Sequence, residues 1–231
     1  MNLTQFFQFT FKASTVPMSF GLSIKTIIYI LSLYVTMLFN VNIVTARIIL
    51  KRIPLKSEIS RQYVNPRAIG VNLTTNRIYV GNGDSTVSVI DGKTNSRKDT
   101  VKIKNISNFH LRGLGVNTIT NRIYIAGLGG TVDVINGKNN KIIDTIIVWE
   151  GSDGAKSIFP PTSTAEGVAV NSITNYIYVT HSGNIVSVID GENNQVIDTI
   201  ILRNIENVQG VELNALTNRI YVTGSALSVI D

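Results

Sequence analysis

Short apolar runs alternate with turns rich in asparagine, threonine and glycine along residues 65–231. Runs such as RIYV and VSVID carry β-branched and aromatic residues, which favour strands over helices. Their apolar character is continuous rather than alternating, and this predicts strands that are buried on both faces. The pattern therefore predicts an all-β region.

The same phrases recur in the same order. The first phrase reads NLTTNRIYV, NTITNRIYI, NSITNYIYV and NALTNRIYV, and it starts at Asn72, Asn117, Asn171 and Asn214, with spacings of 45, 54 and 43 residues. Asparagine and threonine side chains bond to nearby backbone, so NxxTN predicts a turn. VSVID or a close variant follows, and then an Asp-Gly or Asn-Gly pair that predicts a hairpin in the first three copies. The chain is a repeat protein.

Each complete repeat predicts four short antiparallel strands: a lead-in of small and apolar residues, RIYV, VSVID and an outer strand. Four strands in about 45 residues are the signature of a β-propeller blade. Blades are expected at about 65–104, 110–148, 165–203 and 208–231. The small lead-in residues suit strands that converge near an axis.

Each complete repeat contains TN-R-IYV or a close variant, followed by phrases such as VSVIDG and VIDTI. This order of phrases resembles the YVTN family of β-propeller repeats, found in archaeal and bacterial surface-layer and surface-antigen proteins. The resemblance covers about residues 65–231 and implies a surface protein. The family's propellers commonly have seven blades. This chain has about 3.5–4, because the fourth repeat reaches Asp231 before an outer strand. We expect a partial or open propeller.

Three arrangements would cover the open ends of such a propeller. The sequence is a fragment of a longer gene, two chains associate to close the ring, or a strand at 48–55 in the linker 47–64 completes the last blade. The fragment or open form is the favoured interpretation. An open end exposes apolar surface, which carries an aggregation risk.

Residues 1–46 are predicted to hold one hydrophobic helix. No charge occurs from Thr26 to Ala46, and Lys12 and Lys25 precede most of this run. The segment suits a cleaved signal peptide, an uncleaved transmembrane anchor or, less well, a buried soluble helix. The first two place the body of the protein outside the cell or on its surface, with membrane attachment if the segment is retained.

The charge, the cysteine content and the absence of known motifs limit the functions and cofactors that the sequence predicts. The formal charge is +6, and residues 47–231 carry 19 basic and 15 acidic side chains, so no nucleic-acid partner is predicted. The absence of cysteine excludes disulfides, thiolate metal sites and a cysteine nucleophile. His110 and His181 occupy unlike positions in the repeat, and no catalytic motif is present. We predict no cofactor, with a divalent cation left open.

Residues beside the lead-in strands are the candidate ligand site, at the mouth of the axial channel. They are Arg67, Arg112, Glu166, Gln209 and Glu212. Glu212 is the exception in its strand, because its equivalents are Gly70, Gly115 and Ala169. We expect its carboxylate to line the channel, to coordinate a divalent cation, or to pair with Arg67 or Arg112.

The long loop at 149–164 is the candidate partner surface. It carries Trp149, Asp153 and Phe159, and long insertions with aromatic residues suit a protein or cell-surface glycan partner. Asn105 lies in a glycosylation sequon between two blades.

The sequence thus predicts a secreted or surface-anchored propeller that acts as a non-catalytic binding or surface-structural module. The alternatives are a lactonase- or lyase-type propeller enzyme with an axial metal, or a truncated nonfunctional fragment.

Overall fold

The computed structural model describes residues 52–55, 64–103, 111–127, 129–148, 164–181 and 184–231. These residues belong to one compact unit, Lys51–Asp231. Among them no helix is long and apolar enough to cross a membrane. The helix predicted in residues 1–46 lies outside the described part of the chain.

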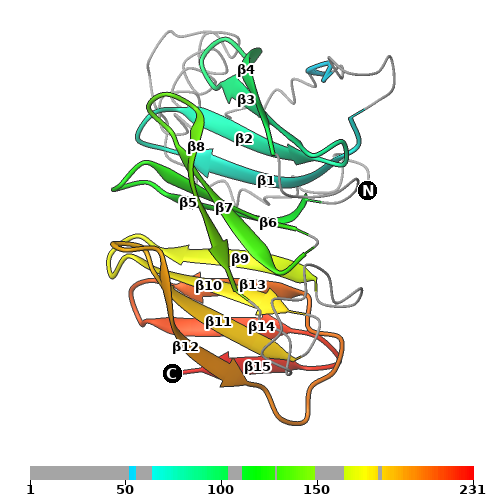
Figure 1. Ribbon diagram of the computed structural model, residues 1–231, viewed down its shortest axis with the longest axis vertical. Helices are drawn as coiled ribbons and strands as arrows, with labels where there is room; N and C mark the ends of the chain where they lie inside the picture. Colours follow the sequence, from blue (N-terminus) through cyan, green and yellow to red (C-terminus); the bar gives the residue numbers. More distant parts are fainter. Residues whose placement is uncertain (1–51, 56–63, 104–110, 128, 149–163, 182–183) are drawn as a thin grey trace, which may run out of the picture. The chain divides into compact units, whose positions relative to one another are not determined.

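The described residues form four antiparallel sheets, each with its strands in chain order (Figure 1). The first sheet contains β1 (Pro66–Asn72), β2 (Arg77–Asn82), β3 (Thr86–Asp91) and β4 (Ser96–Lys102), and the second contains β5 (Leu111–Asn117), β6 (Arg122–Gly127), β7 (Thr131–Asn136) and β8 (Lys141–Ile147). The third contains β9 (Ala165–Asn171), β10 (Tyr176–His181), β11 (Ile185–Asp190) and β12 (Gln195–Ile201), and the fourth contains β13 (Gly210–Asn214), β14 (Arg219–Thr223) and β15 (Leu227–Ile230). The predicted all-β architecture of antiparallel repeat units is confirmed.

The NxxTN phrase forms the turn between the first two strands of each sheet. In the first sheet the Asn72 Oδ1 atom accepts the Thr75 backbone N–H at 3.1 Å, and Asn76 takes a left-handed φ of 51°. The equivalent second asparagines, Asn121, Asn175 and Asn218, have φ of 54°, 61° and 55°. Asparagine tolerates this conformation better than most residues, which explains why both asparagines recur.

The Asp-Gly pair also begins a hairpin, but the residue of this turn with a left-handed backbone conformation is not the glycine. The Asp91 carboxylate accepts the backbone N–H groups of Lys93 and Thr94, and Asn95 has the positive φ, of 53°. Gly92 is required for space, since a Cβ atom there would lie 2.3 Å from the Asn76 Oδ1 atom. The turn is therefore longer than the two-residue hairpin that the pair predicts.

Neighbouring sheets pack face to face through three apolar clusters. Tyr79 and Val89 of the first sheet contact a group around Ile123 and Ile125 of the second, and corresponding clusters join the second to the third and the third to the fourth. In β3 every residue from Thr86 to Ile90 is buried. Burial on both faces of the middle strands is thus confirmed for the first three sheets. In the fourth, β14 is buried at alternate residues, Ile220 and Val222, and therefore on one face.

The small residues of the inner strands accommodate aliphatic side chains of the next sheet. A Cβ atom on Gly70 would lie 2.3 Å from the Leu114 Cδ2 atom, and one on Gly115 would lie 2.6 Å from the Val170 Cγ2 atom. These distances are shorter than any real carbon contact. The inner strands β1, β5 and β9 therefore approach closely because Gly70 and Gly115 lack a side chain.

Repeated polar residues also join neighbouring sheets. The side-chain amides of the first turn asparagines donate to the second turn asparagines of the next sheet, in the pairs Asn72–Asn121 (2.9 Å), Asn117–Asn175 (2.8 Å) and Asn171–Asn218 (3.0 Å). Arg77 and Arg122 each donate to the backbone oxygen of a turn glycine of the next sheet. The asparagines and arginines of the repeat thus hold the sheets together.

The fourth sheet has three strands among the described residues. Residues 52–55, the described part of the predicted closing strand at 48–55, belong to no strand, and residues 48–51 lie outside the described part. The closing strand stays a prediction.

One buried polar position differs from sheet to sheet. Asn82 donates to the Ser88 hydroxyl at 3.0 Å in the first sheet, whereas His181 Nε2 lies 3.0 Å from the Ser187 hydroxyl in the third. Burial lowers the pKa of His181 to about 4. In the second sheet the corresponding acceptor position holds Asp133, and burial raises the pKa of its carboxyl. These groups have structural roles inside the sheets.

Gly115→Val should destabilise the protein by at least about 1–3 kcal/mol, because a branched side chain would overlap Val168 and Val170. The matched change Glu212→Val, at the exposed equivalent position of the fourth sheet, should stay within about 0.5 kcal/mol of wild type. Urea unfolding measures both free energies. Equal effects of the two changes would refute the close-approach explanation.

Stability should fall as the pH drops from about 6.5 towards 4, because unfolded His181 binds a proton in this range and folded His181 does not. The contribution is fully present above the unfolded pKa, and its loss amounts to about 3 kcal/mol. His181→Asn, which copies the Asn82 arrangement, should remove this component. Urea unfolding at pH 7 and pH 4 checks it, and identical pH profiles for the two proteins would contradict it.

Candidate functional site

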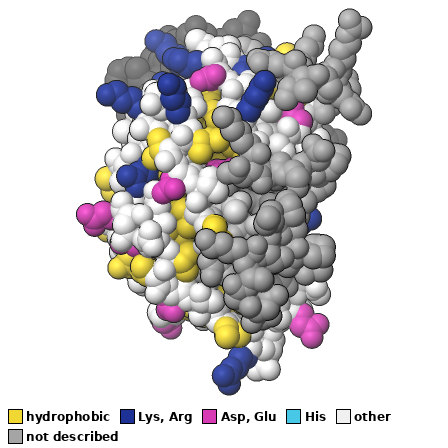
Figure 2. Space-filling model, in the orientation of Figure 1, with side chains coloured by type: hydrophobic (Ala, Val, Ile, Leu, Met, Phe, Trp, Pro, Cys, Tyr) yellow, Lys and Arg dark blue, Asp and Glu magenta, His cyan; other side chains and the backbone are white. Residues whose placement is uncertain are grey.

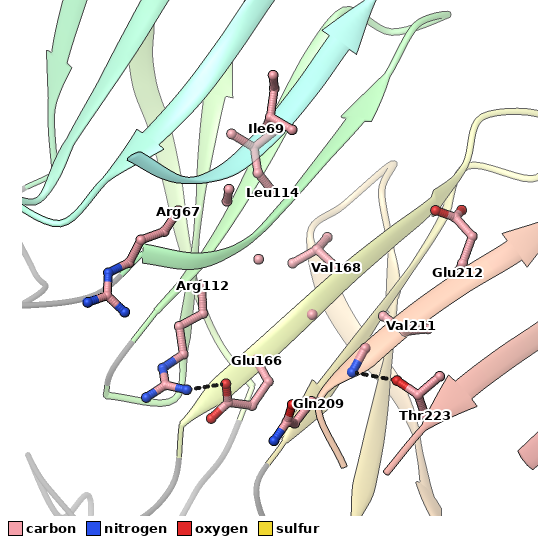
Figure 3. Close-up of a pocket in the computed structure, with 14 residues that line it drawn as sticks. Arg67, Ile69, Arg112, Leu114, Glu166, Val168, Gln209, Val211, Glu212 and Thr223 are labelled. Atoms are coloured by element: carbon pink, nitrogen blue, oxygen red, sulfur yellow. Dashed lines mark hydrogen bonds and ion pairs between the residues drawn. The ribbon is translucent and has the colours of Figure 1, made fainter. Parts of the chain in front are cut away.

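An open pocket of about 680 Å³ lies along the inner strands β1, β5, β9 and β13 (Figure 3). All five residues predicted for the channel mouth line it: Arg67, Arg112, Glu166, Gln209 and Glu212. The structure thus brings together residues that are up to 145 positions apart in the printed sequence.

Backbone bulges direct the charged residues into this pocket. The strand register shifts between Pro66 and Ala68 in β1, and between Leu111 and Gly113 in β5. Arg67 and Arg112 are the extra residues at these shifts. A bulge leaves one residue out of the ladder and redirects its side chain.

The third inner strand has the same irregularity, and Glu166 is its extra residue between Ala165 and Gly167. The fourth differs, because Gln209 directly precedes β13 and its backbone N–H donates to the Thr223 carbonyl oxygen at 2.9 Å. The repeat pattern locates these positions, but it gives no sign of the bulges.

The charged end of the pocket contains one internal ion pair. The Arg112 Nη1 atom lies 2.6 Å from the Glu166 Oε2 atom, and the Thr164 hydroxyl also donates to the Glu166 carboxylate. Arg67 is exposed and pairs with no carboxylate of the described residues. The excess charge at this end is therefore the positive charge of Arg67.

Glu212 lies towards the other end of the pocket, beyond the aliphatic residues (Figure 3). It stands three residues after Gln209, so its side chain is about 10 Å further along the strand direction. Its carboxylate accepts the Leu213 backbone N–H at 3.0 Å. The ion pair expected between Glu212 and Arg112 is not formed, because Arg112 pairs with Glu166.

The wall between the two charged ends is aliphatic. Ile69, Leu114, Val168 and Val211 occupy equivalent positions of the four inner strands and all line the pocket. Ile69 is 68% exposed, far more than the buried apolar residues of the sheets. Among the residues that the structure describes, no aromatic side chain lines the pocket. The pocket therefore offers an apolar strip flanked by opposite charges.

The described residues contain no group of three histidine, cysteine, aspartate or glutamate side chains that could hold a metal ion. Of the carboxylates in the pocket, Glu166 is committed to Arg112. The other candidate residues, Trp149, Asp153, Phe159 and the sequon residue Asn105, lie outside the described part of the chain, as does His110.

The surface drawn in Figure 2 carries both signs of charge. Lysine and arginine side chains are interspersed with aspartate, glutamate and apolar side chains on this face. The coloured part of this face shows no large area of a single charge sign. Charged ligands would therefore interact with individual side chains of this face and not with an extended field.

No protein-family model and no curated protein matches this chain. Solved structures do match. The chain is similar to the structure of U3-55K, with 9% identity over 78% of this chain and 54% of that one, and a TM-score of 0.58. The crystal structure of the RRP9 WD40 repeats gives 9% identity, 78% and 53% coverage and a TM-score of 0.58.

Hydrazine synthase of Kuenenia stuttgartiensis is similar over 79% of this chain and 49% of that one, with 15% identity and a TM-score of 0.61. The chain thus spans about half the length of each of these proteins. At such identities the likeness concerns the fold alone. Together with the four antiparallel sheets, it establishes that the described repeats have a β-propeller fold.

Proposed function

We propose that this protein is a secreted or cell-surface-anchored propeller of the YVTN kind, which acts as a non-catalytic binding module through the pocket of the inner strands. One observation carries the proposal. The repeated asparagines and arginines join the sheets or shape their turns, whereas the polar and charged residues beside the inner strands differ from repeat to repeat and line one open pocket.

The exported location is supported by the hydrophobic segment that precedes the propeller in sequence and by the resemblance of the repeats to surface proteins. Binding is supported by side chains that the fold does not need. The side chains of Arg67, Gln209 and Glu212 are exposed, and none of these side chains bonds to a described residue of a neighbouring sheet. Side chains of this kind, placed on a rigid scaffold, are available for recognition.

The pocket chemistry favours binding over the enzyme alternative. Hydrolysis or elimination assisted by a metal ion needs several converging ligands, and the pocket has two carboxylates, one of which is already paired. Glu212 stands alone at its end of the pocket. We therefore infer a site that recognises a partner and leaves it chemically unchanged.

A photo-crosslinking amino acid at position 209 tests this function in the full chain, displayed by the cells that produce it. On illumination it should capture a specific cell-surface or secreted macromolecule. The matched control carries the crosslinker at Ile173, which is 67% exposed in a turn outside the pocket.

Equal capture at both positions, or capture at neither, would contradict the binding function. Metal analysis of the same purified protein addresses the alternative. A stoichiometric divalent cation that is lost on Glu212→Ala would favour the enzyme.

A further inference from the structure

The two ends of the pocket present opposite charges to a ligand. Arg67 supplies a guanidinium at one end that pairs with no carboxylate in the described part of the chain. The neighbouring Arg112 is neutralised by Glu166 at 2.6 Å. Glu212 supplies a carboxylate at the other end, where three equivalent strands have glycine or alanine. A ligand with one uniform charge would be attracted at one end and repelled at the other.

The separation of these ends suits an extended peptide. Arg67 lies on the first inner strand, β1, and Glu212 on the fourth, β13, so a ligand that contacts both has to cross β5 and β9. A free phosphate, carboxylate or metal ion would contact only one end. The occupant must therefore be an elongated molecule.

The wall of the pocket favours a protein segment over a glycan. Ile69, Leu114 and Val168 offer aliphatic surface to the ligand, and Ile69 leaves 68% of its surface exposed. Sugar rings are commonly recognised by aromatic faces and dense hydrogen bonding, and none of the described residues that line this pocket is aromatic. Aliphatic peptide side chains would instead remove this surface from water.

We propose that the pocket binds an extended segment of a partner protein that carries an acidic side chain, then aliphatic side chains, then a basic side chain. The acidic group pairs with Arg67, the aliphatic groups cover Ile69 and Leu114, and the basic group pairs with Glu212. This inference rests on the proposed binding function and adds the chemistry of its partner.

Fluorescence anisotropy with the full chain and three labelled six-residue peptides tests the inference. Each peptide has two central valines, and its first and last residues are aspartate and lysine, two aspartates, or two lysines. Wild type should bind the mixed peptide about three- to tenfold more tightly than the other two, as expected for two exposed charge pairs. High salt should reduce this preference.

Reversing the charge at either end of the pocket should change which of the three peptides binds most tightly. Arg67→Glu should favour the peptide with two lysines, and Glu212→Arg should favour the peptide with two aspartates. Lys138→Glu and Glu192→Arg are the matched controls, because these exposed turn residues lie outside the pocket and change the net charge in the same ways. The control variants should bind the three peptides in the same order of affinity as wild type. Circular dichroism and the melting temperature verify that every variant is folded.

The inference is overturned if wild type does not discriminate between the peptides, or if the controls change the order as much as the pocket variants do. Should the crosslinker at position 209 capture a partner in that case, the binding function would stand and only the partner chemistry assigned here would fail.

Discussion

The close approach of neighbouring inner strands is the constraint on which the rest of this structure depends. Leu114 and Val116 point at Gly70, and Val168 and Val170 point at Gly115, at distances that leave no room for a Cβ atom. Once the inner strands are this close, the middle strands of adjacent sheets bury each other's tyrosine, valine and isoleucine side chains. The turn asparagines are then within bonding distance of the next sheet.

This constraint also explains the composition of the repeat. Apolar packing between sheets is strong but non-directional, and it would tolerate several relative positions of two flat faces. The amide pairs Asn72–Asn121 and Asn117–Asn175, and the bonds from Arg77 and Arg122 to turn glycines, fix one of these positions. A network of buried polar groups stabilises a fold most when every group has its partner, and all four repeats keep both asparagines. The arginine is kept in three repeats and is replaced by Tyr176 in the third.

Much of the fold could be predicted from the sequence because it depends on local periodicity. The strand order, the NxxTN turns and burial on both faces follow from runs such as RIYV and from asparagine chemistry. The role of Gly92 could not be predicted, because it depends on a side chain of another turn, Asn76. The pairing of Arg112 with Glu166 depends on the relative position of two sheets, which no local pattern encodes.

The candidate site was predictable in position and not in geometry. Comparison of the repeats identifies residues 67, 112, 166, 209 and 212 as the variable positions beside the inner strands, and all of them line the pocket. The register shifts that turn Arg67 and Arg112 out of the ladder leave no trace in the residue pattern. The loop around Trp149 and the segment before residue 52 stay predictions.

Repeated residues build the scaffold, and the exposed exceptional residues Arg67, Gln209 and Glu212 are free for binding. The free energy of unfolding of six alanine variants tests this claim most directly. Asn117→Ala, Asn171→Ala and Arg122→Ala should each cost about 1–3 kcal/mol, because each leaves partners of the neighbouring sheet unsatisfied. Arg67→Ala, Gln209→Ala and Glu212→Ala should each stay within about 0.5 kcal/mol of wild type. Losses of equal size in the two sets would contradict the account.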